Sequence, residues 1–290
     1  MSTTVATGAS VEAIQHHYDL SNDFYALWLD PSMTYSSALW YGDESLSSAQ
    51  RNKLDWHLDR VQIDTAERLL DVGCGWGSLL HRATERNPRC HGVGLSLSAA
   101  QLAAIAEHHW PRIETRLESW ADHEADAPYD GIVSIGAFEH FARLDQSPRE
   151  KLEGYRAFFV FCHRVSKPRG PLSLQTITYE TADREQFSRF FAERIFPESD
   201  LPHLHEIAQA AHGLFEIVEL RNDRAHYART LRHWLSALRA HKDEAIALVG
   251  ERAYIDYERY LGLMVVAFHT GTMNLCRLAL RRLDPPGVLA

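Results

Sequence analysis

The sequence contains no excess of basic residues. Its 30 lysines and arginines stand against 39 acids, which gives a formal charge of −9. Proteins that bind a phosphate backbone or an anionic bilayer need basic patches, so the composition argues against a nucleic-acid partner. The sequence also lacks a run of about 18 apolar residues, which argues against membrane insertion. The first ten residues have no basic or apolar segment typical of a secretion signal, so we expect a cytoplasmic protein.

Cysteine is scarce as well. The four cysteines, Cys74, Cys90, Cys162 and Cys276, form no CxxC pair and have no spacing typical of a zinc site. We therefore expect buried thiols in a reducing compartment, with neither a disulfide nor a metal.

The sequence does contain an alternation of short apolar runs and helical patterns. This alternation predicts a doubly wound α/β fold whose first five strands are parallel, with a last strand that is antiparallel and inserted beside the sixth. We predict strands at 68–72, 90–95, 113–117, 129–135, 171–177, 214–220 and 274–280. We predict one or two short helices within 11–29. We predict further helices at 47–61, 98–109, 150–165, 227–249 and 253–268. A chain of 290 residues accommodates this as one large domain.

The segment DVGCGWG at 71–77 follows the first predicted strand and opens a helix. Such a turn surrounds a ligand with backbone N–H groups. The spacing is GxGxG rather than GxGxxG, and the second strand ends at Ser96 without a carboxylate for a ribose, which disfavours a nicotinamide cofactor. Asp71 suits a ligand that carries an ammonium group. The alternative is that the glycines only form a turn and Asp71 only caps a helix.

A resemblance to a known family extends over roughly residues 11–285. It rests on TYSSALW (34–40), LLDVGCGWG (69–77), GVGLSLSAAQ (92–101), SIGAFEHF (134–141), IFP (195–197) and HYARTL (226–231). In order and spacing, these segments are similar to the cyclopropane fatty acid and mycolic acid cyclopropane synthases, in their short form. The resemblance implies a mostly parallel, seven-stranded, Rossmann-like methyltransferase sheet and S-adenosylmethionine as methyl donor. It divides the single domain 1–290 into a helical lid (11–60), a donor-binding core (61–180), a substrate cover (181–270) and a terminal strand with a tail (271–290).

The resemblance also implies donor-binding residues. The family's Tyr-Ser pair falls on Tyr35 and Ser36, its glycine turn on Gly73 and Gly75, and its ribose-binding glutamine on Gln101. The tryptophan beside the adenine falls on Trp120. We add Asp71 and Ile135, which end strands at the same edge of the sheet. Ordinary packing for Trp120 and a solvated helix position for Gln101 are the alternatives.

On the acceptor side, Glu139 lies just past the fourth predicted strand, where a carboxylate can stabilise a cation or accept a proton. His140 is adjacent and titratable, or merely a capping residue. Tyr227 matches the family's active-site tyrosine. Four aromatic rings are candidates to face a cationic substrate or else to pack in the core: Tyr18, Tyr35, Phe138 and Phe141.

The sequence departs from the family at two positions. Ser37 replaces the family's cysteine and Gln175 replaces its histidine, and both positions surround a bicarbonate that acts as base in the family. Neither serine nor glutamine is a base near neutral pH. The sequence therefore predicts S-adenosylmethionine as cofactor, a weakened bicarbonate site and little cyclopropane formation from unactivated acyl chains.

Our leading hypothesis is a C-methyltransferase that acts on an alkene or aromatic carbon of a small hydrophobic metabolite. The alternatives are a fatty-acyl cyclopropane synthase and a small-amine N-methyltransferase, since the Glu139-His140 pair also resembles plant benzylisoquinoline N-methyltransferases. A catalytically silent donor-binding protein and a nicotinamide oxidoreductase remain as further readings. The methyl acceptor, the stereochemistry and the oligomeric state are left open.

Overall fold

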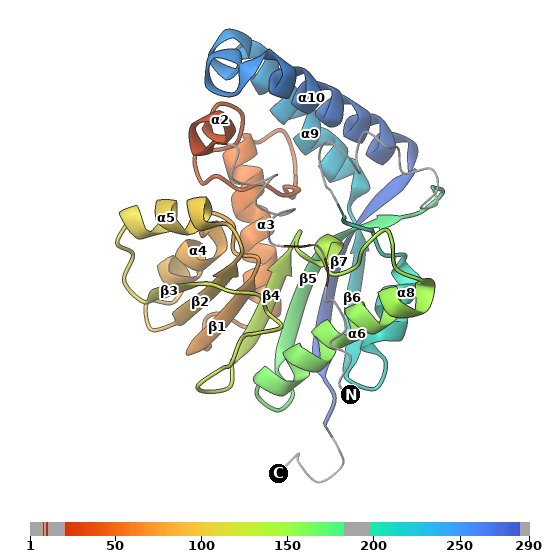
Figure 1. Cartoon of the computed structure of the whole chain (residues 1–290). Coiled ribbons are helices and arrows are strands. Elements are labelled where there is room, and N and C mark those ends of the chain that lie inside the picture. Colours follow the sequence, from red (N-terminus) through yellow and green to blue (C-terminus); the bar gives the residue numbers. More distant parts are fainter. Residues whose placement is uncertain (1–7, 9, 11–20, 183–197, 285–290) are drawn as a thin grey trace.

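A seven-stranded sheet forms the centre of the computed structural model, which describes residues 8, 10, 21–182 and 198–284 (Figure 1). The strand order is β3-β2-β1-β4-β5-β7-β6. The strands are β1 (Arg68–Val72), β2 (His91–Ser96), β3 (Ile113–Leu117), β4 (Gly131–Ile135), β5 (Pro171–Tyr179), β6 (Phe215–Asn222) and β7 (Met273–Arg282). The first five are parallel, and β7 lies antiparallel between β5 and β6, which confirms the predicted fold class.

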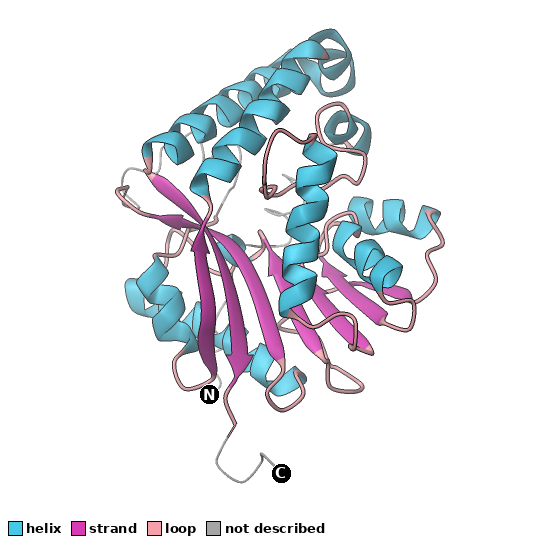
Figure 2. Cartoon of the chain, turned by 180° about the vertical axis from the view of Figure 1, so that it is seen from behind, coloured by secondary structure: helices cyan, strands magenta, loops and turns pink. Residues whose placement is uncertain are grey.

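Helices cover both faces of the sheet. Figures 1 and 2 show α3 (Leu46–Arg60), α4 (Ser78–Arg86) and α5 (Ala99–Glu107) on one face, and α6 (Pro148–Val165) and α8 (Leu204–Ala211) on the other. Local sequence accounts for the start of α6, where Ser147 and Glu150 form a reciprocal capping box and Pro148 lies in the first turn. Strands β1 and β4 are buried almost throughout because helices lie on both sides of them.

Three further helices lie beyond the carboxyl ends of the parallel strands: α2 (Asn22–Ala26), α9 (Arg224–Ala240) and α10 (Lys242–Thr270) (Figure 1). The sequence predicts one break in this stretch, between residues 249 and 253, and the structure confirms an interruption there. Gly250, with φ 83° and ψ 157°, leaves the helical conformation and kinks α10, and a second break at His241, between α9 and α10, was not predicted. The first half of the predicted 11–29 segment and the motif at 195–197 lie outside the described residues.

The strand order reverses between β1 and β4, because the chain leaves β1 toward β2 and returns on the other side to β4. In doubly wound sheets, ligands bind at the carboxyl ends of the strands beside such a reversal. The four cysteines are buried free thiols. Within the described ranges, none of the helices is both long and apolar enough to cross a bilayer.

Candidate functional site

The glycine-rich turn between β1 and α4 forms the floor of the site. Gly73 and Gly75 have φ angles of 87° and 54°, in the left-handed region that favours glycine. A Cβ on Gly73 would lie 2.6 Å from that of Ala137, so the turn packs closely on the loop after β4. A Cβ on Gly75 would meet no atom within 4 Å. The backbone at Gly75 therefore faces open space.

A cavity of about 420 Å³ occupies that space, a volume typical of small-ligand sites. The structure brings all eight predicted donor-binding residues into its wall: Tyr35, Ser36, Asp71, Gly73, Gly75, Gln101, Trp120 and Ile135. Their contacts with the donor stay a prediction. The open backbone at Gly75 and the carboxylate of Asp71 nevertheless fit a ligand with a nucleoside and an ammonium group.

Asp71 and Gln101 are among the buried polar side chains that line this cavity. Burial raises the pKa of Asp71 to about 7, although the ammonium of Lys53 acts in the opposite direction. Gln101 is only 4% exposed, so it is not a solvated helix position. The hydroxyl of Ser96 donates a hydrogen bond of 3.0 Å to Oε1 of Gln101, and the N–H₂ group of Gln101, which has no acceptor among the described residues, can donate to a ligand.

Aromatic residues form the opposite wall. Trp120 lines the cavity and also packs on Phe141 and Phe158, with ring centroids 5.3 and 5.5 Å away, so it is both wall and core. Phe141 lines the same cavity. The prediction that Phe138 faces the ligand was wrong: its ring stacks on Tyr155 at 4.6 Å inside the core, because the 3-10 helix η1 (Phe138–His140) turns it away from the site.

A smaller cavity of about 50 Å³ adjoins the first, with Tyr35, Ser36, Gly136 and His140 lining both. Glu139 lies in its wall and is 6% exposed. Its Oε1 accepts a hydrogen bond of 2.7 Å from the N–H of Ile177, whereas Oε2 has no partner within the described part of the chain. Burial raises the pKa of Glu139 to about 7, against the lowering effect of the Ile177 N–H. The site thus holds a carboxyl group with one unsatisfied oxygen.

The other predicted acceptor-side residues surround Glu139. Ser37, Gln175 and Tyr227 line the small cavity, and the hydroxyl of Ser37 donates to the carbonyl of Ala38 at 3.1 Å. His140 Nδ1 lies 2.7 Å from the hydroxyl of Ser199, and burial lowers the pKa of His140 to about 4. His140 is therefore neutral near pH 7. Tyr18 lies outside the described residues.

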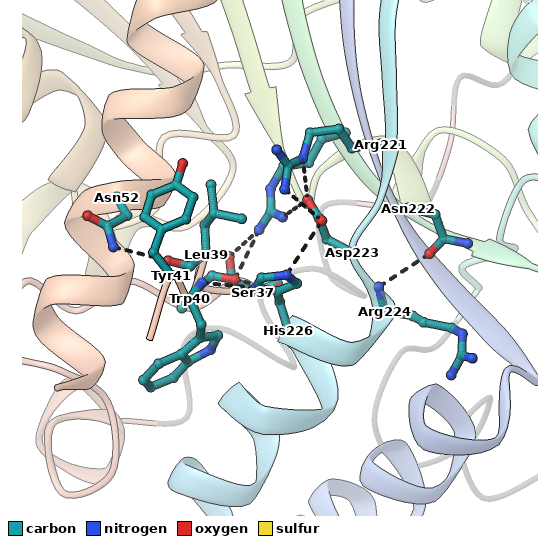
Figure 3. A network of polar contacts seen from close by, with 12 residues as sticks. Ser37, Leu39, Trp40, Tyr41, Asn52, Arg221, Asn222, Asp223, Arg224 and His226 are labelled. Atoms are coloured by element: carbon teal, nitrogen blue, oxygen red, sulfur yellow. Dashed lines mark hydrogen bonds and ion pairs between the residues drawn. The ribbon is translucent and has the colours of Figure 1, made fainter. Parts of the chain in front are cut away.

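A buried arginine organises the rear of this cavity. Arg277 of β7 is fully buried and forms an ion pair with Asp223, which precedes α9. Its Nε donates to Oε1 of Gln175 at 2.8 Å, and its second terminal nitrogen donates to the carbonyls of Ser37 and Ala38 at 3.0 and 3.1 Å. Figure 3 shows Ser37 near Asp223, whose carboxylate also contacts Arg221 and His226.

The arginine determines which way the amide of Gln175 points. A guanidinium only donates hydrogen bonds, so the atom of Gln175 that faces it is the carbonyl oxygen. His57 Nε2 lies 3.5 Å from the same oxygen, and burial holds the pKa of His57 well below its usual range. The N–H₂ group of Gln175 has no acceptor in the described ranges and is the donor that this side chain presents to the small cavity.

Sequence reasoning missed four buried polar residues near the site: Lys53, His57, Asp223 and Arg277. One signal was available for Arg277, because an arginine in the middle of the apolar run MNLCRLAL requires a buried partner. Lys53 and His57 gave no such signal, since the helical pattern of 46–60 does not show which face is covered.

The family model described as "Mycolic acid cyclopropane synthetase" matches residues 6–278. The "Cyclopropane mycolic acid synthase 2" of Mycobacterium leprae is 37% identical over 292 residues, which cover 93% of each chain.

Solved structures that resemble this chain are also cyclopropane synthases. The cyclopropane synthase MmaA2 from Mycobacterium tuberculosis superposes with a TM-score of 0.84 at 33% identity, covering 94% of this chain and 99% of that one. The mycolic acid cyclopropane synthase CmaA1, complexed with SAH and CTAB, gives 0.85 at 34% identity with the same coverage. These relatives favour the acyl cyclopropane alternative over our leading hypothesis of a small-metabolite C-methyltransferase.

Proposed function

The chain belongs to the mycolic acid cyclopropane synthetase family and is an S-adenosylmethionine-dependent enzyme of the methyltransferase type, and from this premise we propose that it cyclopropanates a carbon–carbon double bond in an unsaturated acyl chain. One observation carries the proposal: the buried carboxyl group of Glu139, with its unsatisfied Oε2, lies in a small cavity that adjoins the donor cavity. An unsaturated acyl chain is uncharged, so it interacts favourably with a buried carboxylate only after methyl transfer has converted it into a carbocation.

When bound, S-adenosylmethionine supplies an electrophilic methyl group. Methyl transfer to one alkene carbon leaves a carbocation on the other. Loss of a proton from the new methyl group then closes the cyclopropane ring, and the electron pair of that C–H bond forms the third ring bond. We assign two roles to Glu139: its carboxylate stabilises the cation and accepts the proton.

The walls of the small cavity support this chemistry by excluding water, which would otherwise capture the cation. Tyr35, Tyr227 and Tyr260 line it with aromatic rings, and each ring face attracts a desolvated cation by about 0.5 to 2 kcal/mol. Tyr227 is only 6% exposed and packs on Phe268 with ring centroids 4.5 Å apart, so its ring is held in place.

A second candidate acceptor is an electron-rich aromatic carbon. Ser37 and Gln175 favour it, because neither side chain can act as a base near neutral pH beside Glu139. A ring cation is delocalised and can lose its own ring proton, so it depends less on a second base. Both candidates share the donor, the cation and the role of Glu139.

The deciding experiment uses S-adenosylmethionine labelled in its methyl group. We expect labelled cyclopropane from a phospholipid with a monounsaturated acyl chain, in larger amount than product from a panel of indoles and phenols. Label found only in the aromatic acceptors would replace the proposal with the second candidate. Added bicarbonate tests the anion site: we expect it to accelerate the Ser37→Cys, Gln175→His double variant more than the unchanged enzyme.

A further inference from the structure

Lys53 is a buried lysine in the wall of the donor cavity. It projects from α3, is 1% exposed, and its ammonium donates a hydrogen bond of 2.8 Å to the hydroxyl of Ser36. In the described part of the chain no carboxylate lies within 4.0 Å of it, whereas Lys151 and Lys167 each form an ion pair with an aspartate. A serine hydroxyl cannot neutralise the charge.

The two nearest acids do not supply the missing partner. Asp30 is occupied by its own turn, where its carboxylate accepts hydrogen bonds from the backbone N–H groups of Ser32 and Thr34 and from the Ser32 hydroxyl. Asp71 lines the cavity but forms no ion pair with Lys53. Both acids act on Lys53 only from a distance, and burial lowers the pKa of Lys53 to about 7.

An unpaired ammonium in a closed site is unfavourable unless an anion completes it. S-adenosylmethionine carries one anionic group, the carboxylate of its methionyl part, and two cationic groups that Lys53 would repel. We propose that Lys53, with the hydroxyl of Ser36, binds the carboxylate of the donor, while Asp71 receives its ammonium group.

This assignment orients the donor in the cavity. Its amino-acid end lies at α3 and the 34–37 segment, and its nucleoside extends toward Gln101 and Trp120, which line the same cavity. The 34–37 segment is itself held by α3, because the amide of Gln50 donates to the carbonyls of Thr34 and Ser36 at 3.1 and 2.9 Å. One helix therefore positions both the cation and the hydroxyl.

The test compares S-adenosylmethionine with its decarboxylated form by calorimetric titration, without any methyl acceptor. We expect the unchanged protein to bind S-adenosylmethionine about 10- to 100-fold more tightly than the decarboxylated form, the size of a charge-assisted hydrogen bond. Lys53→Met should remove most of this preference by weakening only the binding of S-adenosylmethionine. Lys242→Met, on the exposed side of α10, is the matched control and should retain the preference.

Equal affinities of the unchanged protein for the two ligands would overturn the assignment, whether or not Lys53→Met folds. So would a Lys53→Met protein that folds and loses affinity for both ligands equally. Ser36→Ala, a milder change, should reduce the preference in part. Because no acceptor is present, these results are independent of the proposed cyclopropanation.

Discussion

At the scale of single residues, the site depends on carboxyl groups that the fold has removed from water. Asp71 lies near the end of β1 and Glu139 lies in η1, just past the neighbouring strand β4, and burial raises the pKa of each to about 7. A carboxyl group with such a pKa still exchanges its proton near neutral pH, which is the property of an effective acid–base group. For Asp71, a bound ammonium group would favour the ionised form.

We expect Glu139→Gln to bind S-adenosylmethionine normally but to lower turnover by about a hundredfold or more, the usual size of a lost acid–base or electrostatic contribution. The amide keeps the shape of the side chain and removes its charge. The turnover of the unchanged enzyme should fall as the pH drops below about 7, because the raised pKa means that Glu139 becomes protonated there. Initial rates across pH 5.5 to 9 test both points, and a variant with full activity would make Glu139 merely structural.

Gly75→Val is expected to abolish donor binding. The φ of 54° strains any branched residue, and the new side chain would project into the space that the donor requires. The measurement is titration calorimetry with S-adenosylmethionine on a variant whose fold has been checked by circular dichroism. Gly213→Val provides a control, since Gly213 also has a positive φ and open space around it but lies outside both cavities. Unchanged affinity in a folded Gly75→Val protein would refute the donor site.

At the scale of elements, the ion pair between Arg277 and Asp223 connects three segments that meet behind the small cavity. Strand β7 carries the arginine, Asp223 precedes α9, and the 36–39 segment supplies two carbonyl acceptors. Asp223 also pairs with Arg221 at 3.0 Å. The network therefore holds Gln175, Ser37 and the start of α9 in one arrangement, and α9 carries Tyr227 into the acceptor site.

Arg277→Met should lower acceptor turnover at least tenfold while changing the affinity for S-adenosylmethionine less than twofold. Arg277 does not line the donor cavity, but its loss frees the Gln175 amide to rotate. We also expect a loss of stability of about 3 kcal/mol or less, because Asp223 keeps Arg221 as a partner. Single-turnover rates, donor titration and urea unfolding separate these effects. A parallel loss of donor affinity would show that the network is purely structural.

At the scale of the whole molecule, the donor cavity joins regions that are distant in the sequence. Its wall includes the 33–36 segment, α3, the ends of β1 and β2, and the loops after β3 and β4. A ligand bound there contacts all of them at once. Donor binding is therefore coupled to the folding of the sheet and of the segments that cover it.

Donor binding should raise the midpoint of thermal unfolding. A concentration of one hundred times the Kd adds about 2.7 kcal/mol to the free energy of unfolding, which corresponds to roughly 5 °C for a chain of this size. S-adenosylhomocysteine should act in the same direction, and NADH should have no effect because the turn lacks the dinucleotide spacing. A shift with NADH instead of S-adenosylmethionine would contradict the donor assignment.

The sequence by itself determined the fold class, the positions of the strands along the chain and the position of the glycine turn. These features follow from local patterns: apolar runs of strand length, helical spacing of apolar residues, and a turn that requires positive φ. The family motifs added the predicted donor-binding residues, which the structure brings into one cavity.

Only the tertiary structure decided which polar groups are buried and what faces them. The rotation of Phe138 into the core, the orientation of the Gln175 amide and the isolation of Lys53 each depend on an element distant in sequence. Burial and hydrogen-bond geometry arise from packing between elements, and the energy of a charge depends on every group around it. Local sequence patterns carry no information about those partners.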